Sequence, residues 1–189
     1  MAAMVLGESF EWVLAAAQSG AEWAFARLYE SYNPRLERYF ASRAPRQAED
    51  LAAETWMGAA RTLAQFRGDE SQFRSWLFTI AHRRLADYWN DRRRQGSMPV
   101  EDALAAAGVA PDDTEGSVLD SLSGREAARK IAAALPPDQA EVVLLRVVAG
   151  LEVEQVARIM DRRPGTVRVL QHRALRKLGQ VFSLQPVTE

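Results

Sequence analysis

A basic run between Arg162 and Leu178 is the part of the chain whose residue types best fit a defined chemistry. It contains six Lys or Arg and no Asp or Glu. Its apolar residues recur three or four positions apart, which places them on one helical face; they are Val167, Leu170, Ala174 and Leu178. A helix that is apolar inside and cationic outside fits the DNA-reading helix of a helix-turn-helix.

A second helix and a turn must position this run. Val153, Val156, Ala157 and Met160 predict a preceding helix, and Pro164-Gly165 marks a break after it. Thr166 is predicted to cap or open the helix that follows. Four side chains are spaced to share its outer side: Arg168, His172, Arg173 and Arg176. The alternative is an ordinary helical hairpin with a solvated basic face, although such faces usually carry some acids.

Composition narrows the class of protein. The 189 residues suffice for one domain or two small ones, and a net charge of −1 argues against a generally basic nucleic-acid binder. Without cysteine there are no disulfides, thiolate metal sites or cysteine nucleophiles. No apolar run approaches the roughly 20 residues that span a bilayer. The N-terminus has no basic leader, so we expect a soluble cytoplasmic protein.

Helical periodicity predicts an all-α fold, starting with a first unit over residues 21–96. Asn33-Pro34 lies within its first stripe, which indicates two helices in line or one kinked helix. The next helix has a predicted buried stripe of Leu51, Trp56, Ala60 and Leu63. A loop at 66–71 leads to a helix over about 72–94, for which Ser71 is the predicted cap.

The remaining segments differ sharply in composition. Residues 1–20 form an N-terminal segment with a possible docking patch at Phe10, Trp12, Val13 and Leu14. Residues 97–124 are rich in acids and small residues and read as a flexible linker. A second helical unit is predicted over 125–182, and a short tail over 183–189. The fold prediction is therefore two small helical domains joined by an acidic linker.

The order of these pieces resembles a bacterial RNA polymerase sigma factor of the extracytoplasmic-function group. The matching strings are AEDLAAETWMGAARTLAQFRGD, FRSWLFTIAHRRLADYWNDRRR and LPPDQAEVVLLRVVAGLEVEQVARIMDRRPGTVR. The resemblance implies two domains, called sigma-2 and sigma-4, that bind core polymerase and read the −10 and −35 promoter elements. It implies no catalytic residue, metal or cofactor.

The resemblance also assigns DNA-contacting residues. For the −35 element they are Thr166, Arg168, Val169, His172, Arg173 and Arg176. Val169-Leu170 stands where the commoner form has a Ser-Arg pair, and Asp161 replaces a usual turn glycine, so the detailed −35 code is expected to differ. For the −10 element they are Phe66, Arg67, Gly68, Asp69, His82 and Arg83. The loop would hold a base that has left the stack, and the helix face would grip the separated strand.

Partners follow from the same resemblance. Asp50, Glu54 and Arg61 are implied contacts to the clamp helices of the largest polymerase subunit, and the flap is a second polymerase contact. The acidic linker would pass toward the RNA exit channel, or act as a simple tether. A membrane-linked anti-sigma factor is the implied regulator, with control by synthesis alone as the alternative.

Two other classes of protein account for part of the pattern. A free-standing helix-turn-helix repressor or activator explains residues 125–180 equally well. It does not explain the basic second half of the 72–94 helix or the FRGD loop. A DNA-acting enzyme such as a recombinase would need a clustered acidic triad or a placed nucleophile, and the sequence offers neither.

Overall fold

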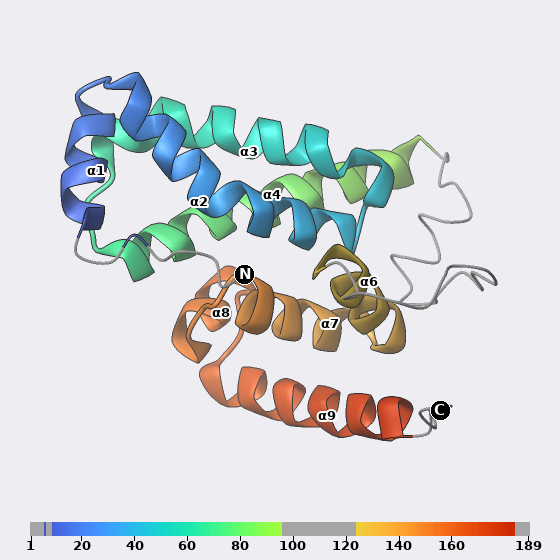
Figure 1. Ribbon diagram of the computed structural model, residues 1–189. Helices are drawn as coiled ribbons and strands as arrows, with labels where there is room; N and C mark the ends of the chain where they lie inside the picture. Colours follow the sequence, from blue (N-terminus) through green and yellow to red (C-terminus); the bar gives the residue numbers. More distant parts are fainter. Residues whose placement is uncertain (1–5, 7–8, 96–123, 184–189) are drawn as a thin grey trace, which may run out of the picture.

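The computed structural model describes residue 6, residues 9–95 and residues 124–183 (Figure 1). The described chain is almost entirely helical, as predicted. Its α-helices are α1 (Phe10–Gln18), α2 (Glu22–Ala41), α3 (Ala48–Thr62), α4 (Glu70–Arg94), α6 (Gly124–Ala134), α7 (Pro137–Val143), α8 (Val153–Ile159) and α9 (Pro164–Ser183). Short 3-10 turns precede and follow α3 at Pro45–Gln47 and Leu63–Gln65, and a π-helical segment, Leu144–Val148, continues α7. The predicted linker, apart from Gly124, and most of the tail lie outside the described residues.

Helices α1 to α4 pack around an aromatic core. Phe73 of α4 is fully buried and contacts the rings of Phe10, Tyr32 and Phe66 at centroid distances of 5.5, 5.2 and 5.5 Å. Phe10 therefore ties α1 into the core, together with the buried Val13 and Leu14 of the predicted docking patch; only Trp12 is exposed there. Burying such rings is the main stabilising contribution available to a bundle of this size.

Helix α2 runs unbroken through Pro34, so Asn33-Pro34 lies within one helix and does not separate two helices in line. The buried Asn33 amide donates to Glu37 at 2.8 Å, and its carbonyl accepts from the Trp56 indole at 3.2 Å. This side chain thereby links α2 to α3. On α3 the predicted stripe was wrong at one position, since Ala60 is exposed and Ala59 is buried.

The start of α4 also differs from the prediction. The helix begins at Glu70 and its cap is Asp69, not Ser71. The Asp69 carboxylate accepts from the Gln72 amide at 2.7 Å, and the Gln72 side chain accepts from the Asp69 amide at 2.9 Å. This reciprocal capping box satisfies two backbone donors that would otherwise lack partners.

Helices α6 to α9 form the second group, with α8 and α9 as the helix-turn-helix. Between them Asp161 adopts a left-handed conformation with φ 51°, at the position where the resemblance implies a turn glycine. Helix α9 begins at Pro164, so Thr166 lies within its first turn and opens the helix, the second of the two predicted roles, instead of capping it from outside. Pro is favoured at a first helical position because its missing N–H would have no intrahelical partner there.

The two groups of helices lie against each other. In Figure 1 the second group lies beneath α2 and α4, with α6, α7 and α8 nearest to them. Helix α2 contacts α6 and the π-helical segment, and α4 contacts α8. Within the described ranges, no helix is both long and apolar enough to cross a membrane.

Candidate nucleic-acid interface

Helix α9 presents the predicted DNA-reading residues to solvent. Val167 and Ala174 are fully buried, and Leu178 is nearly so, which fixes the inner face of the helix. All six residues implied for the −35 element are exposed: Thr166, Arg168, Val169, His172, Arg173 and Arg176. The structure therefore brings this set together on one accessible surface.

One member of this surface is already engaged. The Arg168 guanidinium donates to Glu154 of α8 at 2.8 Å, and both side chains are more than half exposed. An exposed ion pair of this kind contributes little to stability because solvent screens it. It holds Arg168 against the preceding helix, whereas Arg173 lies further along α9.

The loop before α4 is held by its own side chains. Phe66 is 9% exposed and packs on Phe73 and Trp76, so its ring anchors the loop in the core. The Arg67 guanidinium donates to the carbonyls of Ala64 and Phe66 at 2.8 and 2.7 Å. Gly68 has φ 153°, and a Cβ there would lie 2.5 Å from the Gln72 side-chain oxygen. The loop is thus a fixed shape that only glycine permits at position 68.

The structure separates the loop from the other two predicted −10 residues. Helix α4 rises about 20 Å between Asp69 and His82. Arg83 is exposed, whereas His82 turns toward the second group of helices. The six residues implied for the −10 element therefore form a loop at one end of α4 and a distant pair, not one pocket.

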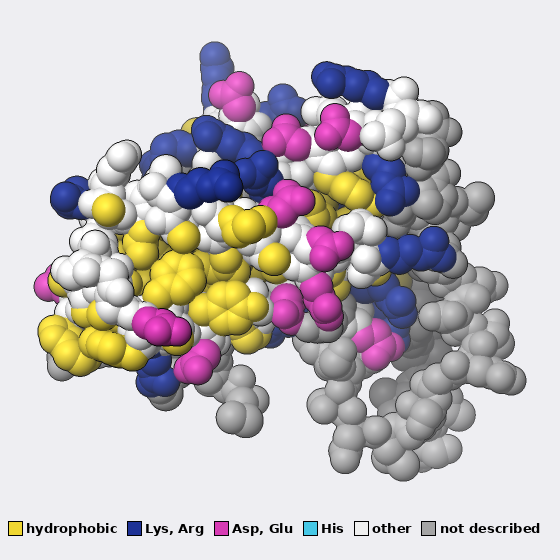
Figure 2. Space-filling view, turned by 90° about the horizontal axis from the view of Figure 1, so that it is seen from above, with side chains coloured by type: hydrophobic (Ala, Val, Ile, Leu, Met, Phe, Trp, Pro, Cys, Tyr) yellow, Lys and Arg dark blue, Asp and Glu magenta, His cyan; other side chains and the backbone are white. Residues whose placement is uncertain are grey.

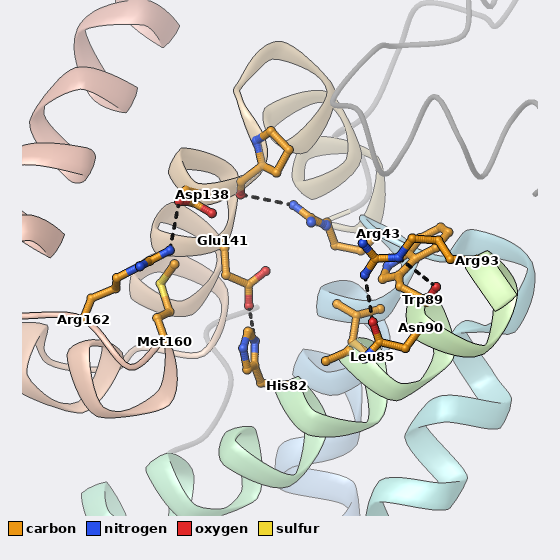
Figure 3. Close-up of a pocket in the computed structure, with 12 residues that line it drawn as sticks. Arg43, His82, Leu85, Trp89, Asn90, Arg93, Asp138, Glu141, Met160 and Arg162 are labelled. Atoms are coloured by element: carbon orange, nitrogen blue, oxygen red, sulfur yellow. Dashed lines mark hydrogen bonds and ion pairs between the residues drawn. The ribbon is translucent and has the colours of Figure 1, made fainter.

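His82 meets a buried carboxylate of α7. Its Nδ1 lies 2.8 Å from Glu141 Oε1, and the Tyr39 hydroxyl of α2 donates to the same oxygen at 2.6 Å. Figure 3 shows Glu141 and His82 pointing toward one another from α7 and α4. Glu141 is 5% exposed and Tyr39 is fully buried. We call these three residues the interdomain triad.

Electrostatics favour a charged Glu141 in this setting. Burial by itself raises the pKa of this carboxyl. The hydrogen bond and charge of His82, the charge of Arg43 and the hydrogen bond from Tyr39 outweigh burial, so the pKa lies below the ordinary 4.5. Burial, reinforced by the Glu141 charge, raises the pKa of Tyr39, so its hydroxyl keeps the proton that it donates.

Two further contacts join the groups of helices. The buried Gln155 of α8 donates to the carbonyl and hydroxyl oxygens of Ser71 at 3.1 and 3.0 Å. Arg43, after α2, donates to the Pro137 carbonyl at 3.3 Å. Tyr39, Arg43 and Glu141 were not predicted as site residues from the sequence; the signal that could have indicated them is an acid within the strongly apolar run of 140–148.

Helix α3 displays the residues implied for polymerase binding. Asp50, Glu54 and Arg61 are all exposed, and their spacing places them on one side of the helix. Met57 lies on the same side of α3 and is 53% exposed, although it was not predicted from the sequence as a contact residue. Exposed apolar side chains also gather over α1, α2 and α3 (Figure 2). Trp12 of α1 and Trp23 of α2 are both exposed, and their ring centroids lie 4.7 Å apart.

The arrangement defines a class of protein: two small helical groups, the second ending in a helix-turn-helix with a basic outer face. Comparison with known proteins extends this. The sequence profile described as Sigma-70 region 2 matches residues 28–95, and the one described as Sigma-70, region 4 matches residues 118–178.

Relatives agree with the profiles. The ECF RNA polymerase sigma factor BldN of Streptomyces coelicolor is 37% identical over 88% of this chain, which spans 63% of the length of BldN. The ECF sigma factor SigD of Mycobacterium tuberculosis is 30% identical over 91% of this chain and 83% of SigD. The chain belongs to the extracytoplasmic-function group of the sigma-70 family.

A solved structure shares the fold. The sigma factor RpoE of Bartonella quintana, in complex with the anti-sigma factor NepR, superimposes with a TM-score of 0.65 at 24% identity. The match covers 85% of this chain and 98% of that one. Two helical domains of the sigma-2 and sigma-4 type are thus the shared architecture.

Proposed function

We propose that the chain is a promoter-specificity subunit: it binds core RNA polymerase, recognises the −35 element and opens the −10 element. The observation that carries the proposal is the outward face of α9, where the whole predicted contact set is exposed on a helix-turn-helix. The chain itself would catalyse nothing, because the polymerase supplies the chemistry. It would act in the cytoplasm, where polymerase and promoter DNA are found.

Helix α9 is proposed to enter the major groove at the −35 element. Base edges in that groove carry a distinct pattern for each base pair, and Arg can hold guanine with two hydrogen bonds. Among the described residues, Arg173 and Arg176 have no hydrogen-bond or ion-pair partner, whereas Arg168 must exchange Glu154 for DNA. Val169, 50% exposed, is positioned to meet a thymine methyl group.

The row Asp50, Glu54, Met57 and Arg61 on α3 is proposed as the core-polymerase contact. Charged side chains around an exposed methionine fit an interface that is apolar at its centre and polar at its rim. Sequestration by an anti-sigma factor is proposed as the regulation, because such a partner could cover this row.

The experiment that tests the function is reconstituted transcription with core polymerase from the source organism. Adding the chain should produce transcripts from a specific set of promoters in a genomic library, and core polymerase alone should not. The combined substitution Glu54→Ala and Met57→Ser should reduce co-purification with core polymerase. Glu30→Ala, an exposed acid on α2, is the matched control and should leave it unchanged.

Sequence-specific duplex binding at nanomolar concentration by the chain alone, with no polymerase association, would instead support the repressor reading. Near-zero net charge and small basic faces provide few phosphate contacts for strong independent binding.

A further inference from the structure

The cavity between the two groups of helices has walls of opposite charge. Its volume is about 520 Å³. One wall comes from Arg43, which follows α2, and from α4, and it carries cations but no carboxylate; its polar members are Arg43, His82, Asn90 and Arg93. The opposite wall supplies Asp138 and Glu141, along with Arg162. The first wall therefore lacks an anion of its own.

Two donors on this wall have no hydrogen-bond acceptor among the described residues. The Nε of Arg43 and the indole Nε1 of Trp89 are both buried at the cavity. Trp89 is 92% buried, so solvent cannot satisfy its N–H at low cost. These two donors therefore remain unsatisfied while the two domains are docked.

Glu141 fills the end of this surface. Tyr39 and His82 both contact the same carboxylate oxygen, and Arg43 lies close enough for its charge to favour the ionised form. A phosphate oxygen can take the place of the carboxylate oxygen beside the Tyr39 hydroxyl and the His82 ring nitrogen, and the Arg43 charge favours either anion. Tyr39 cannot shift aside, because its ring packs on Phe40 and Phe78.

We propose that Tyr39, Arg43 and His82 form a binding site for a backbone phosphate of single-stranded promoter DNA, and that Glu141 occupies it in the closed chain as an internal competitor. The proposal rests on the proposed function, because it needs an opened −10 strand to follow α4. The contact of Gln155 with Ser71 holds the second domain over the same helix. Docking of the two domains and strand binding therefore exclude each other.

The test uses the full chain and a fluorescent single-stranded oligonucleotide of mixed sequence, because a phosphate contact does not depend on sequence. Glu141→Gln removes the charge without changing the shape of the side chain. It should raise affinity for the oligonucleotide about tenfold, since apparent affinity is reduced by the fraction of closed chain. The radius of gyration from small-angle scattering should rise as well.

Glu126→Gln on α6 is the matched control, because it removes one carboxylate charge from the same domain at a position that does not line the cavity, where Glu126 pairs with Lys130 of its own helix at 3.2 Å. It should change neither measurement. The double substitution Glu141→Gln with Arg43→Gln should lose most of the gain in affinity. A folded Glu141→Gln chain with unchanged affinity would overturn the proposal, as would a double variant that keeps the full gain.

A second measurement needs no variant. Because linkage is reciprocal, saturating oligonucleotide must open the wild-type chain and raise its radius of gyration. A saturated chain as compact as the unbound one would overturn the proposal even if Glu141→Gln does not fold. Transcription with core polymerase reports separately on the proposed function, so failure of one is distinguishable from failure of the other.

Discussion

Helices α9 and α4 both present residues implied for promoter contact, yet they differ in what covers them. The outer side of α9 is open to solvent along its whole contact set. On α4, His82 is bonded to Glu141, and Ser71 is bonded to Gln155. The difference suggests that α9 can read duplex DNA while the two domains are docked, whereas α4 can hold a separated strand only after they come apart.

The physical reason lies in what each surface must do. A helix that enters the major groove can remain exposed, because water satisfies its cations until DNA replaces it. A wall that holds a separated strand includes buried donors such as Tyr39, and burial without an acceptor is costly. An acid from the neighbouring domain offsets that cost while the strand is absent.

Gly68→Ala should have the largest effect and should act only on the α4 side. The new Cβ would displace the Gln72 side chain and force a conformation that essentially only glycine adopts. We expect the free energy of unfolding to fall by roughly 2–4 kcal/mol, measured by chemical denaturation. Gly179→Ala, which meets nothing within 4 Å, is the control and should not destabilise the chain.

Arg173→Ala tests the outer side of α9, which is open to solvent. It should weaken binding of the polymerase complex to promoter duplex by roughly 1–3 kcal/mol if Arg173 reads a base. The loss should be the same with and without Glu141→Gln, because no described residue covers the outer side of α9 in the closed form. Lys130→Ala on α6 is the control. Unequal losses in the two backgrounds would mean that closure reaches α9 as well.

Acid should open the closed form. The groups that face Glu141 are Tyr39 and Arg43 from the α2 side and His82 from α4. Because the pKa of Glu141 is lowered on folding, its contribution is complete above 4.5 and is lost as pH falls through the lower folded value. Scattering should show expansion only below pH 4.5 in the wild type. A Glu141→Gln chain that is already expanded should show no such step.

Asp161→Gly should have the smallest effect. Asp161 holds φ 51°, a conformation that costs an L-residue energy but suits glycine. We expect the free energy of unfolding to rise by about 0.5–1 kcal/mol, with no change in strand affinity. Arg163→Gly, at an exposed neighbour without positive φ, is the control. A loss of stability in Asp161→Gly would show that the Asp161 side chain stabilises the turn.

Local sequence patterns were sufficient to predict the helices and many of their buried faces. The spacing of Val167, Ala174 and Leu178 determined which side of α9 is buried, and hence that Arg173 is exposed, because an amphipathic helix has one way to hide its apolar stripe. The predicted break over residues 161–165 located the turn, although Pro164 and Gly165 belong to the first turn of α9. The capping residue of α4 was missed, since Asp69 and Ser71 are both good caps and only the reciprocal bond to Gln72 distinguishes them.

Tertiary structure alone decided the interdomain triad. Tyr39, His82 and Glu141 are separated by 43 and 59 positions, and each reads locally as an ordinary side chain of its own helix. No helical periodicity relates residues on three different elements, so their meeting depends on how two domains dock. The sequence determined what the helices are and which faces are apolar; docking determined that an acid of one domain lies against the cations of the other.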